Sequence, residues 1–284
     1  MNRHADRKLS RLYDQDEITG VPTGFTDLDR ILGGMQPSDL LIIAGRTGRG
    51  KTSFMLSMAL NAIKMYHKRV AVFSLEMSND QLASRLIAQE TGINSQRLRQ
   101  GWLEENEWGQ FKEATNLIGN APLYLDDTPA LSVLNLRTKC LNLHNEVKLD
   151  LIVVDYLQLM TADLRYENRT QEVSYISRSL KLLARELNVP VIVAVQLPQA
   201  VESCDSQKAM LSDLRELGSL EMDSDVVIFL HHPDEWDDDP QKRSVTEIVV
   251  AKHRNGPTGS VNLIFLESLT KFVDHERRTF RFEA

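Results

Sequence analysis

The sequence predicts an α/β protein whose mainly parallel, twisted β-sheet is covered by helices on both faces. Short β-branched runs, several of them apolar on both faces, recur along the 284-residue chain. They alternate with segments of helical apolar periodicity, which is typical of a parallel sheet buried on both sides. A glycine-rich loop between one such run and a helix adds a phosphate-binding motif. The length permits two small domains or one large one, and we expect one.

Six runs form the predicted parallel part of the sheet: 39–45, 69–75, 122–126, 150–156, 189–196 and 225–230. One predicted helix spans 51–67, after the glycine-rich loop. Another spans 172–187, because its apolar residues are spaced by three and four: Val173, Ile176, Leu180, Leu183 and Leu187. Ser78 and Gln81 form a capping box that begins a third helix.

The chain ends in a different pattern. The runs 245–252 and 260–266 are joined through the turn-forming segment 255–259, which predicts a C-terminal β-hairpin. At the other end, residues 1–19 predict a short linker helix outside the core. We therefore divide the chain into this N-terminal extension and one large domain over residues 20–284.

Composition narrows the setting of the protein. A formal net charge of −7 argues against a surface coated in nucleic acid but permits a local basic lining. Cys140 and Cys204 stand in no disulfide-framework or zinc-ligand spacing, which favours a reducing, cytoplasmic compartment. No apolar stretch approaches the length of a membrane span, and the first residues lack the apolar core of a signal peptide. We therefore expect a soluble protein without a membrane partner.

The segment GRTGRGKTS matches the P-loop pattern G-x-x-x-x-G-K-[ST], and it lies where that motif is required, between a buried strand and a helix. Its glycines let backbone N–H groups and the helix N-terminus face phosphates. Lys51 is expected to reach the β- and γ-phosphates, and Thr52 to bind Mg²⁺. The predicted residues for ATP are Gly45, Arg46, Thr47, Gly48, Arg49, Gly50, Lys51, Thr52 and Ser53. The pattern assigns no role to Arg49.

Three further polar residues end predicted strands or their turns. Asp155 is placed as the Walker-B carboxylate for the metal, although a strand-end carboxylate can also be a helix cap. Glu76 is placed as the base that orients the attacking water, or else it only favours the N-terminus of the next helix. Gln196 can sense the γ-phosphate through a neutral hydrogen bond. Their convergence with Lys51 on one sheet edge supports the catalytic interpretation.

Seven stretches stand in a specific order and spacing between Ile18 and Phe265: ITGVPTGFTDLDRILGGMQPSDLLIIAG, VFSLEMS, LYLDD, LIVVDYLQLM, NRTQEVSYISRSLKLLARELNVPVI, LSDLRELGSLEMDSDVV and AKHRNGPTG. Together they resemble the RecA-like C-terminal domain of bacterial replicative DNA helicases of the DnaB type. The resemblance implies a RecA-like P-loop NTPase fold in a ring of six, which hydrolyses ATP between subunits to move on single-stranded DNA and unwind forks. It also implies a replisome location on the nucleoid, with a helicase loader and primase as partners.

The same resemblance assigns site residues: the P-loop pair Lys51 and Thr52, the base Glu76, the Walker-B Asp155 and the sensor Gln196. Lys252 and Arg254 match the basic pair that reaches the next subunit's nucleotide. Two apart in an extended segment, they point the same way, and a guanidinium so held can stabilise a transferring phosphoryl group. Without the resemblance, a solvated hairpin tip would be the simpler interpretation.

For DNA, the segment 213–219 matches the family's DLRESGS. Arg215 and the backbone near Glu216 and Gly218 are expected to bind phosphates without reading bases. A second candidate is the loop after Met160, with Arg165 and Arg169, whose charges could equally be ordinary surface charge.

The sequence also departs from the family. Arg49 is added to the P-loop, which predicts a change in nucleotide affinity without loss of binding. Pro198 and Gln199 replace a Ser-Arg pair, and Leu217 replaces a serine, which predicts weaker DNA binding. A preceding domain is not seen, so we expect an excised core or a short relative whose residues 8–16 contact the neighbouring subunit. Two alternatives stay open. One is a RecA-, RadA- or KaiC-like ATPase, and the other is a catalytically weak helicase paralogue acting as an ATP-dependent DNA clamp or regulator.

Overall fold

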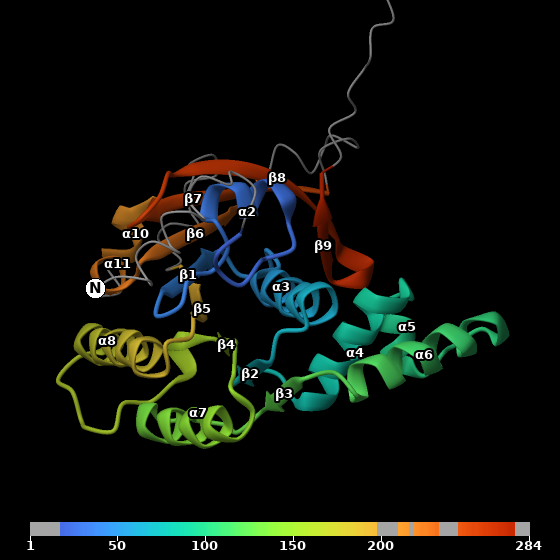
Figure 1. The fold of residues 1–284 in the computed structure, drawn as a ribbon, viewed down its shortest axis with the longest axis horizontal. Helices are drawn as coiled ribbons and strands as arrows, with labels where there is room; N and C mark the ends of the chain where they lie inside the picture. The colour runs from blue at the N-terminus through green and yellow to red at the C-terminus, as the bar shows by residue number, and fades with distance from the viewer. Residues whose placement is uncertain (1–17, 198–209, 216–218, 233–243, 276–284) are drawn as a thin grey trace, which may run out of the picture.

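A computed structural model describes residues 18–197, 210–215, 219–232 and 244–275. Its centre is one nine-stranded sheet in the order β3-β2-β4-β5-β1-β6-β7-β8-β9 (Figure 1). The strands are β1 (Leu40–Gly45), β2 (Val70–Ser74), β3 (Leu123–Asp126), β4 (Leu151–Asp155), β5 (Val191–Gln196), β6 (Val226–His231), β7 (Val245–His253), β8 (Gly259–Leu266) and β9 (Lys271–Asp274).

The helices of the described segments connect and cover these strands. They are α2 (Thr26–Leu32), α3 (Lys51–Tyr66), α4 (Asn79–Thr91), α5 (Ser95–Gln100), α6 (Trp108–Gly119), α7 (Val133–Val147), α8 (Arg169–Leu187), α10 (Leu211–Arg215) and α11 (Leu220–Asp223). Short 3₁₀ turns are η1 (Glu105–Glu107), η2 (Leu157–Leu159) and η4 (Glu267–Leu269). None of the helices so described is long and apolar enough to cross a membrane.

The predicted parallel sheet is confirmed for all six strands from β3 to β6. Every residue of β1 is buried, as expected for a central strand with helices on both faces. The register places Gly45 of β1 beside Gln196 of β5, and Ser74 of β2 beside Asp155 of β4. The carboxyl ends of these four strands therefore lie together on one edge of the sheet.

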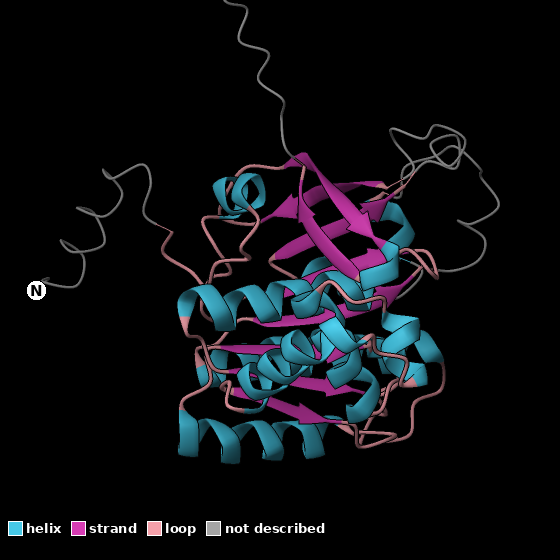
Figure 2. Cartoon of the chain, turned by 90° about the vertical axis from the view of Figure 1, so that its right-hand side faces the viewer, coloured by secondary structure: helices cyan, strands magenta, loops and turns pink. Residues whose placement is uncertain are grey.

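The predicted C-terminal hairpin is also confirmed, as the antiparallel pair β7 and β8. It is part of the main sheet, because β7 pairs antiparallel with β6, and β9 adds a further strand that the sequence did not predict. Figure 2 shows the strands with helices packed on both sides of the sheet. Since β7 runs opposite to β6, the residues after β7 lie at the amino-terminal edge of the parallel strands.

Two hydrophobic cores fill the layers on the two faces of the sheet. The first holds α2, α3 and α4, with Leu28, Phe54 and Leu82 completely buried. The second holds α7 and α8, with Leu136 and Leu180 equally buried. Figure 1 shows α5 and α6 extending beyond the β3 edge of the sheet.

The helix boundaries follow local capping. Helix α8 begins at Arg169, three residues before the predicted start, because the Asn168 side chain accepts a hydrogen bond from the Gln171 N–H. Its predicted apolar face is buried. Helix α4 begins with the predicted capping box, in which the Ser78 and Gln81 side chains accept from each other's backbone N–H groups.

An aromatic cluster packs beneath the P-loop and joins α3 to the C-terminal strands. The Phe272 ring stacks on Phe265 at 4.6 Å between centroids and meets Phe54 edge-on at 5.3 Å. Phe54 in turn stacks on Phe25 of the segment before α2, at 5.6 Å. Phe272 is 1% exposed, and a Cβ on Gly50 would lie only 3.0 Å from its ring. The cluster therefore supports the P-loop from below.

We expect Phe272→Ala to lower the free energy of unfolding by about 3–5 kcal/mol, because a large buried ring is replaced by a cavity. Urea unfolding followed by circular dichroism measures the change. Phe111→Ala is the control, since Phe111 is only partly buried and packs against an exposed tryptophan. Equal decreases in the free energy of unfolding in the two variants would show that the aromatic cluster contributes no more to stability than a partly buried ring does.

Candidate nucleotide site at the carboxyl edge of the sheet

The P-loop joins β1 to α3, and its glycines have two different structural requirements. Gly48 and Gly50 have φ angles of 76° and 80°, a left-handed conformation that side chains with Cβ rarely adopt. Gly50 also caps α3 without a side-chain hydrogen bond, so the first N–H groups of the helix stay available to an anion. Gly45 has no positive φ and is the last residue of β1. A Cβ there would lie 3.3 Å from the Leu230 carbonyl oxygen, so glycine is favoured because β1 and the end of β6 approach each other closely.

Lys51 and Thr52 occupy the first turn of α3. The Lys51 ammonium donates to the carbonyl oxygens of Gly45 and Arg46, both at 2.9 Å, and so folds back over the loop. Thr52 Oγ1 donates to Asp155 Oδ2 at 2.7 Å. Thr52 of the predicted P-loop pair is thus in direct contact with the predicted Walker-B carboxylate.

Asp155 ends β4 with only 3% of its surface exposed. Burial raises its pKa, and the negative charge of Glu76 raises it further. The Thr52 hydrogen bond and the positive charges of Lys51 and Arg85 lower it. A buried carboxylate beside a hydroxyl is a pair of hard oxygen donors, which suits Mg²⁺ together with phosphate oxygens. The residues therefore fit the metal that the P-loop implies.

Glu76 lies two residues after the end of β2, at the same edge of the sheet, and is exposed. Arg85 of α4 is partly buried nearby. Burial lowers the pKa of its guanidinium, and the charges of Asp155 and Glu76 oppose that change. Arg85 was not predicted from the sequence, which carries no local signal that this residue of α4 approaches Asp155 and Glu76.

Gln196, at the end of β5, is held between the P-loop and η2. Its Nε2 donates to Thr47 Oγ1 at 2.7 Å. Gln158 of η2 clamps the Gln196 main chain: Gln158 Nε2 donates to the Gln196 carbonyl at 2.7 Å, and the Gln196 N–H donates to Gln158 Oε1 at 3.3 Å. Gln196 lies at the edge that the sequence predicts, whereas Gln158, which lies in an apolar run, was not predicted.

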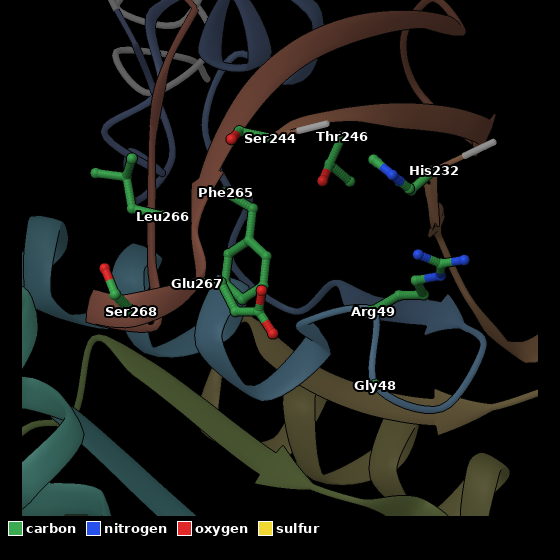
Figure 3. Close-up of a pocket in the computed structure, with 9 residues that line it drawn as sticks. All are labelled: Gly48, Arg49, His232, Ser244, Thr246, Phe265, Leu266, Glu267 and Ser268. Atoms are coloured by element: carbon green, nitrogen blue, oxygen red, sulfur yellow. The ribbon is translucent and has the colours of Figure 1, made fainter. Parts of the chain in front are cut away.

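A pocket of about 550 Å³ opens beside the P-loop, between it and the C-terminal strands. Figure 3 shows Arg49 and His232 on one side of it, with Phe265 and Glu267 extending toward its interior from the other. An aromatic ring can stack on a base, and a carboxylate can accept hydrogen bonds from sugar hydroxyls. Arg49, which the motif left unexplained, therefore lines the space next to the phosphate loop.

Lys252 and Arg254 lie at the opposite edge of the sheet. His253 pairs with Val226 at the start of β6, and Val226 is next to Leu41 near the start of β1. The P-loop follows the end of β1, a strand of six residues, so at about 3.3 Å per residue the two edges are roughly 17 Å apart. Arg254 cannot reach the P-loop of its own chain.

Both basic residues contact the segment around α11, although β7 ends at His253 and Arg254 lies in the turn that follows it. The Lys252 ammonium donates to the carbonyls of Glu221 and Ser224, the latter at 2.6 Å. Burial is the first cause that lowers the Lys252 pKa, followed by the charge of Arg254. Arg254 Nη2 donates to the Met222 carbonyl at 3.3 Å.

The predicted DNA contacts are only partly described. Arg165 is exposed in the loop between η2 and α8. Arg169, the first residue of α8, is ion-paired with Glu172 and donates to the Gln158 carbonyl at 2.6 Å, so its guanidinium anchors that loop. Arg215 ends α10, and its side chain is not described. The other predicted residues that lie outside the described segments are Glu216, Gly218, Pro198, Gln199, Leu217 and residues 8–16.

Comparison with known proteins adds independent information. Residues 20–274 match the family described as "DnaB-like helicase C terminal domain". The chain is 48% identical over 272 residues to the replicative DNA helicase DnaB of Geobacillus stearothermophilus, covering 95% of this chain and 60% of that protein. It is 47% identical over 263 residues to the replicative DNA helicase DnaC of Bacillus subtilis, covering 92% of this chain and 58% of that protein.

Solved structures agree. One, described as an ATPase domain, superposes with a TM-score of 0.87 at 36% identity, covering 97% of this chain and all of that one. Another, of a DnaB-like replicative helicase and its interactions with primase, gives a TM-score of 0.86 at 37% identity. It covers 95% of this chain and 67% of that chain.

Proposed function

The chain belongs to the DnaB-like helicase C-terminal domain family, and from this premise we propose that it is the ATPase core of a replicative DNA helicase. It spans about three fifths of the length of the curated relatives it matches. The activity of the whole protein, ATP-driven translocation on single-stranded DNA and unwinding of duplex during replication, is therefore part of the proposal. The same holds for a cytoplasmic location at the replisome.

The carboxyl edge of the sheet supplies one half of the proposed ATP site. The P-loop N–H groups and Lys51 would bind the phosphates, and the pocket lined by Arg49, Phe265 and Glu267 would take the nucleoside. Thr52 and Asp155 would hold Mg²⁺, which when bound neutralises charge on the β- and γ-phosphates. The Thr52 hydroxyl already contacts the Asp155 carboxylate, which supports this assignment.

Two groups would act on the reacting atoms from this half of the site. Glu76, exposed and acidic, would orient the attacking water and accept its proton. Gln196, whose side chain is hydrogen-bonded to Thr47, would contact the γ-phosphate and so sense whether that phosphate is present. Arg85 stands near Glu76 and Asp155, where a guanidinium can balance the charge of the phosphates.

The single observation that carries the oligomeric part of the proposal is the separation of Arg254 from the P-loop. The basic pair and the P-loop lie at opposite edges of one sheet, so Arg254 can act on a nucleotide only in another subunit. A head-to-tail contact of this kind generates a ring when its rotation closes. This geometry favours a ring with Arg254 as an arginine finger in trans, and the family resemblance implies that the ring has six subunits.

Single-stranded DNA is proposed to bind through the loop around Arg215 and, secondarily, the loop that carries Arg165. One related structure is titled as a replicative helicase with its interactions with primase. By analogy with that relative we propose primase as a partner, and the family resemblance adds a helicase loader to the proposal.

The proposal is tested by ATP hydrolysis with and without single-stranded DNA, followed by unwinding of a forked duplex. We expect DNA to raise turnover and ATP to drive strand separation, and Lys51→Ala to abolish both. A protein that hydrolyses ATP at a DNA-independent rate, and that remains monomeric with ATP and Mg²⁺, would refute the helicase assignment. DNA-stimulated turnover without strand separation would assign an ATP-dependent clamp instead.

A further inference from the structure

Asp225, directly before β6, is a buried carboxylate that the hydrolysis proposed above does not use. Its side chain is 3% exposed. Oδ2 accepts hydrogen bonds from the Leu40 N–H at 2.8 Å and from the Lys181 ammonium at 2.5 Å. Oδ1 lies 3.2 Å from Arg254 Nη1. One carboxylate thus joins the start of β1, helix α8 and the residue that follows β7.

The main chain fixes the same pair from a second direction. The Arg254 N–H donates to the Asp225 carbonyl at 2.8 Å, and the Asp225 N–H donates to the Leu40 carbonyl at 3.0 Å. Asp225 is therefore bonded to the central strand through both its main chain and its side chain, and Arg254 contacts it through its backbone N–H and its guanidinium. The Arg254 side chain therefore extends from a fixed position on the sheet.

Arg254 nevertheless remains accessible to a partner, because half of its side chain is exposed. Its guanidinium contacts Asp225 and the Met222 carbonyl, and it carries more N–H donors than these two contacts use. An arginine can therefore keep its anchor and still donate to a phosphate. A long side chain without an anchor would have to lose much more rotamer freedom in the transition state.

We propose that Asp225 is a positioning residue that holds the Arg254 guanidinium toward the nucleotide of the neighbouring subunit. The inference rests on the trans role of Arg254 proposed above. Charge stabilisation is most effective when the donor is in place before charge develops on the phosphoryl group. Asp225 supplies that preorganisation in the subunit that donates the arginine, without contacting the nucleotide itself.

The test replaces the carboxylate by its isosteric amide, Asp225→Asn. We expect ATP turnover to fall at least about tenfold, because a preorganised charge contact to the transition state is weakened. Nucleotide affinity, measured with a fluorescent ATP analogue, should stay within about twofold, because the P-loop is untouched. If the amide prevents assembly, Asp225→Glu replaces it, since the charge is kept while its oxygens are displaced by one methylene.

Mixing two variant subunits distinguishes a loss of the Arg254 function from a loss of activity in the whole subunit. Glu76→Gln subunits lack the base but carry a normal Asp225 and Arg254, whereas Asp225→Asn subunits keep a complete P-loop half. In an equimolar mixture, about one interface in four pairs an intact P-loop half with an intact finger. We expect turnover to rise to about a quarter of the wild-type value, above that of either variant alone.

Arg254→Ala mixed with Glu76→Gln is the reference for the trans role itself. If that mixture gains no activity, the proposed trans finger fails. If it gains activity while the Asp225→Asn mixture does not, the trans finger stands and the inference about Asp225 is overturned. Wild-type turnover in Asp225→Asn alone would also overturn it.

Asp150→Asn is the matched control. Asp150 directly precedes β4 as Asp225 precedes β6, and it is paired with an arginine, Arg69, at 2.8 Å. That pair has no contact with Arg254, so we expect turnover close to that of wild type. A loss as large as that in Asp225→Asn would mean that any broken pair at this edge impairs the enzyme, and it would overturn the inference.

Discussion

Glu76→Gln is expected to reduce ATP turnover by about 10²- to 10⁴-fold while leaving nucleotide binding intact, because it removes the base and keeps the shape of the side chain. The carboxylate is exposed at the edge where Asp155 and the P-loop meet, so an amide there can neither take a proton nor attract the water in the same way. Steady-state hydrolysis and equilibrium titration with a fluorescent ATP analogue measure the two effects.

Glu113→Gln is the control for this change, since Glu113 is exposed on α6, away from the site, and should keep normal turnover. Turnover of Glu76→Gln within about threefold of the control would remove Glu76 from the role of base. A loss of nucleotide binding of similar size to the loss of turnover would make it a binding residue instead.

Arg254→Ala is expected to lower turnover by about 10³-fold or more, as for the removal of an arginine finger. Arg254→Lys should recover only part of the loss, because an ammonium lacks the planar fork that contacts phosphate and Asp225 together. Nucleotide affinity of the separate subunit should not change, since Arg254 lies at the far edge of its own sheet. Turnover is measured over a range of protein concentration that spans ring assembly.

The matched control is Arg137→Ala on α7, because Arg137 is similarly exposed and is also paired with a carboxylate, that of Glu186. It should behave as wild type, as exposed ion pairs contribute little to stability. Doping Arg254→Ala subunits into wild type should reduce activity in proportion to their fraction if the sites act independently, because each variant subunit disables only the site of its neighbour. Action in trans is tested instead by mixing Arg254→Ala with Glu76→Gln subunits, and no gain over either variant alone would contradict it.

Much of the fold was predictable because its signals are local. Runs such as 40–45 and 151–155 are apolar on both faces, and this pattern is typical of strands covered on both sides. The capping box at Ser78 and the spacing of apolar residues in α8 are likewise patterns that short stretches of sequence contain completely. The extra strand β9 was missed because four residues carry too little periodicity.

The site was predictable to the extent that topology forces convergence. Parallel strands end on one edge, so Gln196 and Asp155 had to lie near the P-loop once their strands were recognised. Arg85 and Gln158 were not predictable in the same way, because their contacts depend on the rotation of a helix and the path of a turn. The pocket beside Arg49 was also missed, since Phe265 comes from a strand more than two hundred residues later.

The sequence by itself determined that this protein has a P-loop, a parallel sheet and polar groups at the ends of its strands, because each of these is encoded over short spans of chain. Only the tertiary structure decided that Arg254 stands at the opposite edge from the P-loop and that Asp225 holds it there. The physical reason is strand pairing. The direction of β7 against β6, and not any local pattern, sets which edge a residue occupies and therefore whether it can act within its own chain.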